Sequence, residues 1–457
     1  MIIHRNMYLG TKGYTIPKEC LHEVQQRELK RTLTFSTRQV YGEGKTVYAY
    51  RESTTKYYVP RFHGIYKYGV VDSMLPSGND IRVPFHGSIR GDQQKAVDAF
   101  MKTKCGLLEL PCGFGKTIVA LYLIHALGKK TMVIVHKEFL LEQWIERIRE
   151  FLPTATVGRI QGDVVDTQHD IVIGMLQSIS TKQYPPELFH EFGFTIIDET
   201  HHIAAEVFSS ALFKLVTPCM LGLSATMERK DGLSSLFKLF LGDIVYSAQR
   251  EKTSVMVHKV LYHVDDTEFN EVIKNFKGET NYTSMIKKIS EYNPRKECIL
   301  TLLTKVLQLP TTGQVMILSH TKSLLTYLHD AIVHRGLGTV GYYIGGLKSS
   351  VLKDTEDKKI VLATFAMAEE ALDIKTLTTL VLASPKTDVV QAVGRILRIK
   401  HEMPLIIDIV DSHSTFINQW KKRRAYYRSQ GYDILETTYE TYPLPARTRS
   451  SCVIQLG

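Results

Sequence analysis

The chain has 457 residues, of which 44% are hydrophobic and 23% are charged, and its formal net charge is +10. This length suits two or three domains, and the composition is that of a globular protein rather than a disordered or fibrous one. The positive charge favours an acidic polymer as partner, although many basic proteins bind no nucleic acid. No apolar run approaches the 18 residues of a membrane span, and residues 1–5 begin no secretory signal. None of the six cysteines lies in a C-x-x-C pair, so neither a zinc site nor a disulfide framework is expected.

Residues 1–80 are rich in Tyr, Lys and Arg and show no sustained periodicity. The stretches 46–50 and 57–59 have strand character, so we expect a small, β-rich accessory domain here. Basic and aromatic residues together suit backbone contacts and base stacking on nucleic acid. Tyrosines like these fill a small core just as often, so both interpretations stay open.

Residues 81–248 alternate strand and helix patterns, which predicts a parallel sheet covered by helices on both faces. The apolar run 131–135 is a strand that ends at a basic residue. It is followed by a helix pattern over 138–151 and by another strand at 170–174. We therefore expect one α/β domain over this range.

A glycine-containing turn in this domain follows an apolar strand and precedes an apolar helix pattern. Gly113 and Gly115 allow backbone N–H groups to curl around phosphate oxygens, and the helix N-terminus adds positive potential. Lys116 would reach the β- and γ-phosphates, and the Thr117 hydroxyl would ligate magnesium. The strict phosphate-loop pattern has glycine at the position of Leu110, so the sequence is a near match that gains support from its context.

Two adjacent acids, Asp198 and Glu199, follow directly on the apolar run 194–197. A buried parallel strand that ends at a polar edge has this pattern. One acid can hold magnesium and the other can orient or deprotonate the attacking water. Two acids at a solvated strand end are common, and the upstream phosphate loop favours the catalytic interpretation.

The range 249–297 is charged and is predicted as a connector, and a second alternating unit is predicted over 298–457. Apolar strands at 314–320, 341–346 and 360–364 predict another parallel sheet for this unit.

The stretch 391–398 of the second unit is predicted as a helix, and its Arg395 and Arg398 share one face because they are three residues apart. Two guanidinium groups on one face can stabilise charge on a transferred phosphoryl group. A solvated helix with two arginines is the alternative. Further along, 420–428 is basic and aromatic, and its helix could be solvated or could contact nucleic acid.

The motifs in order resemble those of superfamily 2 helicases with two RecA-like domains. They are the phosphate loop, Asp-Glu-x-His at 198–201, Ser-Ala-Thr at 224–226 and Gln-x-x-Gly-Arg-x-x-Arg at 391–398. The form of the loop and the stretch 227–231 resemble the XPB-like branch. Short elements at 58–62 and 431–432 are similar to the poxvirus transcript-release and phage UvsW-type helicases.

The resemblance implies roles for further residues. Gln93 would read adenine, and Gln391 would complete the catalytic site together with the two arginines and His201. Three residues would couple hydrolysis to movement: Ser224, Thr226 and Asp373. Four residues at strand ends would contact the nucleic-acid backbone: Lys137, Gln177, Ser178 and Thr364. Ala371 stands where the family usually has glycine, so a very close backbone approach is not expected there.

The resemblance therefore implies an ATP-dependent helicase or translocase that uses ATP and Mg²⁺, with DNA favoured over RNA as its track. Two alternatives stay open: an RNA helicase with the same engine, and an ATPase stimulated by double-stranded DNA that releases transcripts without separating strands. Transcription or replication machinery would be its protein partners. The resemblance further implies a soluble intracellular protein, and for a virus a protein of the host cytoplasm, the nucleus or the virion.

Overall fold

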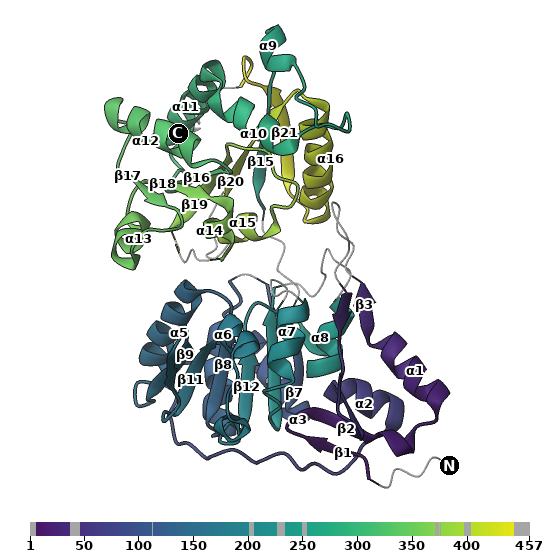
Figure 1. The fold of residues 1–457 in the computed structure, drawn as a ribbon. Coiled ribbons are helices and arrows are strands. Elements are labelled where there is room, and N and C mark those ends of the chain that lie inside the picture. The colour runs from purple at the N-terminus through teal and green to yellow at the C-terminus, as the bar shows by residue number, and fades with distance from the viewer. Residues whose placement is uncertain are drawn as a thin grey trace, which may run out of the picture. The chain divides into compact units, whose positions relative to one another are not determined.

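The chain divides into two compact units, Met1–Arg250 and Glu251–Gly457 (Figure 1). A computed structural model describes residues 6–36, 46–111, 113–200, 205–225, 234–248, 254–370, 374, 376–396 and 404–442. Among these residues, no helix is both long enough and apolar enough to cross a membrane.

The first unit is built on an eight-stranded sheet with the order β10-β9-β11-β8-β12-β13-β7-β14. All neighbouring strands are parallel except the hairpin of β9 and β10. The central strands are almost wholly buried because helices cover both faces, which explains their continuous apolar runs. The strands are β7 (Cys105–Glu109), β8 (Thr131–Val135), β9 (Val157–Gln161), β10 (Val164–Asp166), β11 (Ile171–Met175), β12 (Phe194–Ile197), β13 (Cys219–Ser224) and β14 (Ile244–Ser247).

Two apolar cores lie on opposite faces of this sheet. One core packs the sheet against α3 (Gly91–Thr103), α4 (Lys116–Leu127) and α5 (Glu138–Phe151). The other packs it against three helices: α6 (Leu176–Thr181), α7 (Ala205–Leu212) and α8 (Ser234–Leu241). The predicted parallel sheet with helices on both faces is confirmed.

The N-terminal region forms a small antiparallel sheet with the order β1-β2-β6-β5, a two-stranded sheet of β3 and β4, and two helices. Its apolar side chains belong to the same core as α7 and α8, so it packs directly on the first parallel sheet. Its elements are β1 (Tyr8–Gly10), β2 (Gly13–Pro17), η1 (Lys18–Cys20), α1 (Glu23–Thr32), β3 (Thr34–Ser36), β4 (Thr46–Tyr48), β5 (Arg51–Glu52), β6 (Lys56–Val59) and α2 (Arg61–Tyr68).

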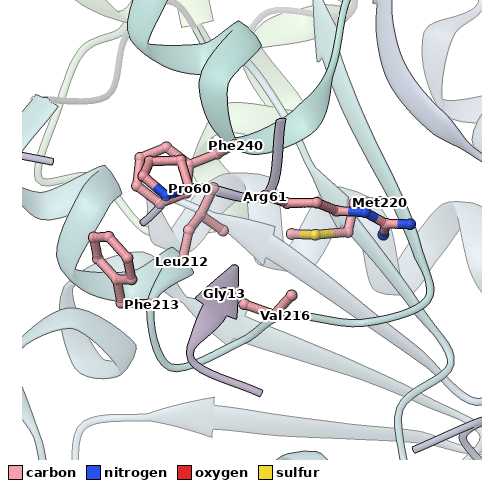
Figure 2. Close-up of a pocket in the computed structure, with 8 residues that line it drawn as sticks. All are labelled: Gly13, Pro60, Arg61, Leu212, Phe213, Val216, Met220 and Phe240. Carbon is pink, nitrogen blue, oxygen red and sulfur yellow. The ribbon is translucent and has the colours of Figure 1, made fainter. Parts of the chain in front are cut away.

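Arg61 joins the N-terminal region to the parallel sheet. Its guanidinium donates to the carbonyl oxygens of Thr217 at 3.4 Å and Pro218 at 3.0 Å, and to Cys105 Sγ at 3.2 Å. Figure 2 shows Arg61 and Pro60 beside side chains of the parallel-sheet domain, around a cavity of about 10 Å³. Pro60 and Arg61 therefore pack directly against residues of the parallel-sheet domain.

The second unit holds a seven-stranded sheet with the order β17-β18-β16-β19-β20-β15-β21, in which every pairing is parallel. Its strands are β15 (Met256–Tyr262), β16 (Gln314–Ser319), β17 (Val340–Tyr343), β18 (Ile360–Thr364), β19 (Leu377–Leu382), β20 (Leu405–Asp411) and β21 (Asp433–Thr438). Its helices are α9 (Thr267–Asn270), α10 (Tyr282–Glu291), α11 (Asn293–Leu307), α12 (Lys322–His334), α13 (Ser349–Glu356), α14 (Phe365–Glu370), α15 (Val390–Arg395) and α16 (Ser414–Ser429).

The range 249–297, which the sequence predicts as a connector, differs in the structure. It contributes β15, which lies between β20 and β21 in the sheet of the second unit. The strand can hold a charged residue because Lys259 is paired: its Nζ lies 3.2 Å from Glu436 Oε2 on the neighbouring β21. A charged side chain that is paired across strands is compatible with an internal strand of a sheet. The charged residues of this range favour a connector only when their partners on other strands are not known.

Replacing Arg61 with methionine should lower the free energy of unfolding of the first unit by about 1–3 kcal/mol, because hydrogen bonds from a charged donor to two carbonyl groups are lost. We expect this in urea titrations followed by Trp144 fluorescence, with Trp420→Phe as the common background. The control is Arg27→Met, since Arg27 and Glu23 form an exposed pair at 4.0 Å. Equal effects of the two substitutions would contradict the joining role of Arg61.

Candidate active site

Five strands of the first sheet bring their carboxyl ends to one edge. The strands β7, β13, β12, β8 and β11 are consecutive neighbours and all run parallel. The turn 110–115, Ser224, Asp198, Lys137 and Gln177 follow or end these strands. These predicted site residues, which are spread from 110 to 224 along the chain, therefore lie along a single edge, where ligands bind in open parallel sheets.

The turn after β7 has the backbone conformation that its glycines permit. Gly113 has φ 83° and Gly115 has φ 91°, and α4 begins at the next residue, Lys116. A Cβ on Gly115 would lie 2.5 Å from Gln93 Nε2, so a larger residue would collide there. The turn is tied to the neighbouring strand because the Leu110 N–H donates to the Ser224 carbonyl at 2.8 Å. A glycine turn at the start of a 12-residue helix fits the phosphates of a nucleotide.

Gln93 is part of the support of this turn. Its Nε2 donates to the Phe114 carbonyl at 2.8 Å, and its Oε1 accepts the Arg90 N–H at 3.0 Å, while the residue is only 2% exposed. The Arg90 guanidinium donates to the same Phe114 carbonyl at 2.6 Å. Both side chains therefore fix the turn from the N-terminal end of α3. The reading of adenine by Gln93 stays a prediction, and its bonds to the turn were not found from the sequence.

Lys116 and Glu199 face each other across this edge. Lys116 Nζ lies 2.5 Å from Glu199 Oε1, and both side chains are largely shielded from solvent. Glu199 has φ 48°, the left-handed conformation that costs a residue with a Cβ of the order of 1 kcal/mol. Such strain is typical of functional sites, and here it accompanies a carboxylate that is held against the phosphate-loop lysine.

Asp198 is a buried acid whose carboxylate accepts hydrogen bonds from two donors. The Trp144 indole N–H donates to Oδ2 at 2.9 Å, and the Glu199 backbone N–H donates to Oδ1 at 2.9 Å. Burial raises the pKa of the Asp198 carboxyl above its usual range and the charge of Glu199 raises it further, whereas Lys116 and the two hydrogen bonds lower it. A positive charge nearby would favour its ionised form.

A magnesium ion fits the donor chemistry of this edge. The described residues contain no cluster of three or more His, Cys, Asp or Glu side chains that could hold a metal alone. Magnesium at nucleotide sites takes most of its ligands from phosphates and water, with only one or two from protein. Asp198 and Thr117, the second residue of α4, supply a carboxylate and a hydroxyl of this kind.

The remaining predicted residues of the first unit have different surroundings. Lys137 is the N-cap of α5, and Gln177 is exposed in the first turn of α6. Ser178 is 9% exposed, and its Oγ accepts the Gly162 N–H at 3.0 Å. Ser224 is fully buried at the end of β13. Gln177 is thus open to solvent, while the Ser178 hydroxyl already holds a neighbouring turn.

In the second unit, Thr364 ends β18 and is half-buried, and Gln391 is half-buried on α15, the helix that Arg395 closes. The side chain of Arg395 is not among those described. Four predicted residues lie outside the described residues: His201, Thr226, Asp373 and Arg398.

The loop that leads into α15 is held from two other helices. Tyr282 on α10 donates its hydroxyl to the Pro385 carbonyl at 2.9 Å, and Arg423 on α16 donates to the Lys386 carbonyl at 2.5 Å. The Arg423 guanidinium also makes two 2.7 Å bonds to Asp408, and both side chains are at most 1% exposed. Within the basic tract 420–428, Arg423 is therefore a buried positioning residue and is closed to nucleic acid.

Comparison with known proteins gives a consistent family assignment. Residues 86–229 match the family described as type III restriction enzyme, res subunit. The chain is 32% identical over 445 residues to the putative ATP-dependent RNA helicase L396 of Acanthamoeba polyphaga mimivirus, covering 92% of this chain and 85% of L396. It is 26% identical over 387 residues to the probable helicase D10 of Escherichia phage T5, covering 82% of each chain.

A solved structure shares the fold. The Mycobacterium smegmatis helicase Lhr, bound to single-stranded DNA and AMP-PNP, aligns with a TM-score of 0.55 at 16% identity. The alignment covers 77% of this chain and 49% of Lhr. At this identity, the similarity supports the predicted pair of RecA-like domains and is no argument about the substrate.

Replacing Asp198 with asparagine should change the free energy of unfolding more favourably at pH 8 than at pH 4, relative to the wild type at the same pH. The raised pKa means that ionised Asp198 costs free energy in the folded protein, and this cost appears as the pH rises from the usual aspartate range through the raised value. Asparagine removes the charge and can accept the Trp144 hydrogen bond with its one amide oxygen, while the hydrogen bond from the Glu199 N–H is lost at both pH values. The measurement is the free energy of unfolding from urea titrations at both pH values.

The control for this experiment is Asp163→Asn, because the Asp163 side chain is fully exposed. It should change the free energy of unfolding little at either pH. An equal change in the free energy of unfolding at pH 4 and pH 8 in Asp198→Asn would contradict the conclusion that burial dominates the ionisation of Asp198.

Proposed function

This chain belongs to the superfamily 2 helicases, and from that premise we propose that it is a nucleic-acid-stimulated ATPase that moves along, or separates, strands of DNA. The observation that supports this most directly is the pairing of Lys116 with Glu199 at 2.5 Å beside the glycine turn. It joins the residue that would hold phosphates to the one that would activate water.

In the proposed mechanism, the backbone N–H groups of the turn and Lys116 bind the phosphates of ATP. The phosphates replace Glu199 as the partner of the lysine. The released carboxylate of Glu199 then accepts a proton from the attacking water. Thr117 and Asp198 would hold magnesium, which would supply positive charge to the transferred phosphoryl group.

The second unit would supply the other half of the catalytic machinery. We propose that Gln391, Arg395 and Arg398 approach the γ-phosphate when the two units close, so hydrolysis requires closure. The hydrogen bonds from Tyr282 and Arg423 to the Pro385 and Lys386 carbonyls support this role because they fix the segment before α15. Four residues would relay the loss of the γ-phosphate to the nucleic-acid face: His201, Ser224, Thr226 and Asp373.

Nucleic acid would be bound along the carboxyl edges of the sheets. Lys137 and Gln177 follow strands of the first sheet and Thr364 ends a strand of the second, and polar groups at such places suit phosphate contacts. We propose DNA as the track on the resemblance to XPB-like and UvsW-type helicases. An RNA helicase is the second candidate, because the mimivirus relative L396 is named as a putative RNA helicase.

Lys116→Ala should abolish ATP hydrolysis, whereas Glu199→Gln should bind ATP and hydrolyse it about 100-fold or more slowly, because a general base of this kind contributes at least that factor. Turnover is measured by phosphate release and binding by a fluorescent ATP analogue. Lys102→Ala, an exposed substitution on α3, is the control. Near-native turnover in both active-site variants would show that this edge is not the hydrolytic site.

The function is tested by measuring ATPase stimulation with double-stranded DNA, single-stranded DNA, branched DNA and RNA side by side. Strand separation is measured on the same ligands. Stimulation by DNA with unwinding supports the proposal, and stimulation by RNA alone favours the second candidate. Stimulation by double-stranded DNA without unwinding indicates a remodelling ATPase. No stimulation by any ligand would refute a nucleic-acid motor.

A further inference from the structure

The segment between α9 and α10 carries an aromatic side chain that packs against almost nothing. Phe276 is 95% exposed, more than any other large hydrophobic side chain among the described residues. It lies at the tip of a short hairpin, whose two arms meet at an antiparallel bridge between Lys274 and Thr280. Single exposed apolar residues are common on surfaces, so the hairpin itself must be considered before a role is assigned.

The hairpin is held in one shape by its own hydrogen bonds. The Asn275 N–H donates to the Glu279 carbonyl at 2.7 Å, and the Gly278 N–H donates to the Asn275 carbonyl at 2.9 Å. The Asn275 Oδ1 accepts the N–H groups of Lys277 at 2.9 Å and Glu279 at 3.0 Å. Gly278 has φ 79°, which closes the turn. Phe276 is therefore presented by an ordered tip, which lowers the entropy cost of binding through it.

The hairpin lies at the carboxyl edge of the second sheet. It follows α9, whose Phe269 carbonyl is 2.8 Å from His413 Nε2, just beyond the end of β20. It precedes α10, whose Tyr282 contacts the Pro385 carbonyl after the end of β19. Because all strands of this sheet are parallel, Thr364 at the end of β18 belongs to the same edge.

The charges at the tip are those that suit a polyanion. Lys274 and Lys277 flank Phe276 and are exposed, and Lys277 Nζ lies 5.8 Å from the centre of the Phe276 ring. The acid on the tip, Glu279, accepts a bond from the Asn275 side-chain amide at 3.3 Å. An exposed aromatic ring with lysines nearby in the chain can stack on a base while an ammonium group contacts a neighbouring phosphate.

We propose that Phe276 is a stacking site for an unpaired nucleobase of the strand that this protein tracks. The inference rests on the proposed function and adds a contact to it. A single ring and its immediate neighbours are far smaller than the surface of about 1,000 Å² that a stable protein interface needs, which favours a base over a protein partner. Purine and pyrimidine rings of DNA and RNA share this stacking chemistry, so the sugar is left to the experiment.

The test compares Phe276→Ala and Phe276→Trp in the full chain, using single-stranded DNA and RNA oligonucleotides in which one abasic position is moved along the strand. Phe276→Ala should weaken binding of the intact oligonucleotide on the order of tenfold, and Phe276→Trp should restore it. At one abasic position, the wild type should bind as weakly as Phe276→Ala, because the stacking partner is missing. ATPase activity without nucleic acid should be unchanged in both variants.

Each outcome decides one proposal. If the wild type is stimulated by nucleic acid but Phe276→Ala binds every oligonucleotide equally well, the stacking site is refuted and the motor function stands. If Phe276→Ala weakens binding by the same factor at every abasic position, the ring contacts something other than a base, and the proposal is also refuted. If no nucleic acid binds or stimulates the wild type, the proposed function itself fails.

Discussion

The ion pair of Lys116 and Glu199 joins residues that are 83 positions apart, and it can form only if β7 and β12 end at the same edge of one sheet. The parallel pairing of both strands with β13 provides that edge. The left-handed backbone of Glu199 then turns its carboxylate towards the lysine. The glycine turn, the start of α4 and the position of Asp198 all follow from the same register. A shift of one residue in the pairing of β12 with β13 would displace Asp198 and Glu199 along this edge and away from Lys116.

Several features of this edge lower the stability of the folded protein. Asp198 is buried with a raised pKa, Glu199 has a strained backbone, and both acids lie close to each other. Each feature costs the folded protein free energy, and a cation bound beside the two acids would lower the electrostatic part of that cost. The surrounding parts are correspondingly rigid: Trp144 holds Asp198, while Gln93 and Arg90 hold the turn. Binding of a cation at this edge would therefore restore part of the stability that the two acids cost the folded protein.

The sequence predicted features that depend on neighbouring residues and missed those that depend on distant ones. The glycine turn, the two acids and both parallel sheets were predicted because each leaves a local pattern, and the sheets are confirmed. The bond of Trp144 to Asp198 was not predicted, because a tryptophan on the apolar side of a helix has the pattern of an ordinary core residue. The charges of Lys259 on β15 and of Arg423 on α16 were misinterpreted for one physical reason: each is neutralised by a carboxylate on another element, Glu436 for Lys259 and Asp408 for Arg423. The site roles themselves stay predictions.

The hydrogen bonds that hold the loop before α15 limit where the chain can be truncated. Arg423 belongs to α16, which follows the last motif of the second unit, yet it neutralises Asp408 in the core and holds the Lys386 carbonyl. A fragment that stopped after β20 would keep every motif but would leave a buried carboxylate without its counter-charge. The Tyr442 hydroxyl, 2.7 Å from His258 Nδ1, ties the chain to β15 still further along. The second unit therefore uses contacts from residues up to 442, well past the residues that resemble helicase motifs.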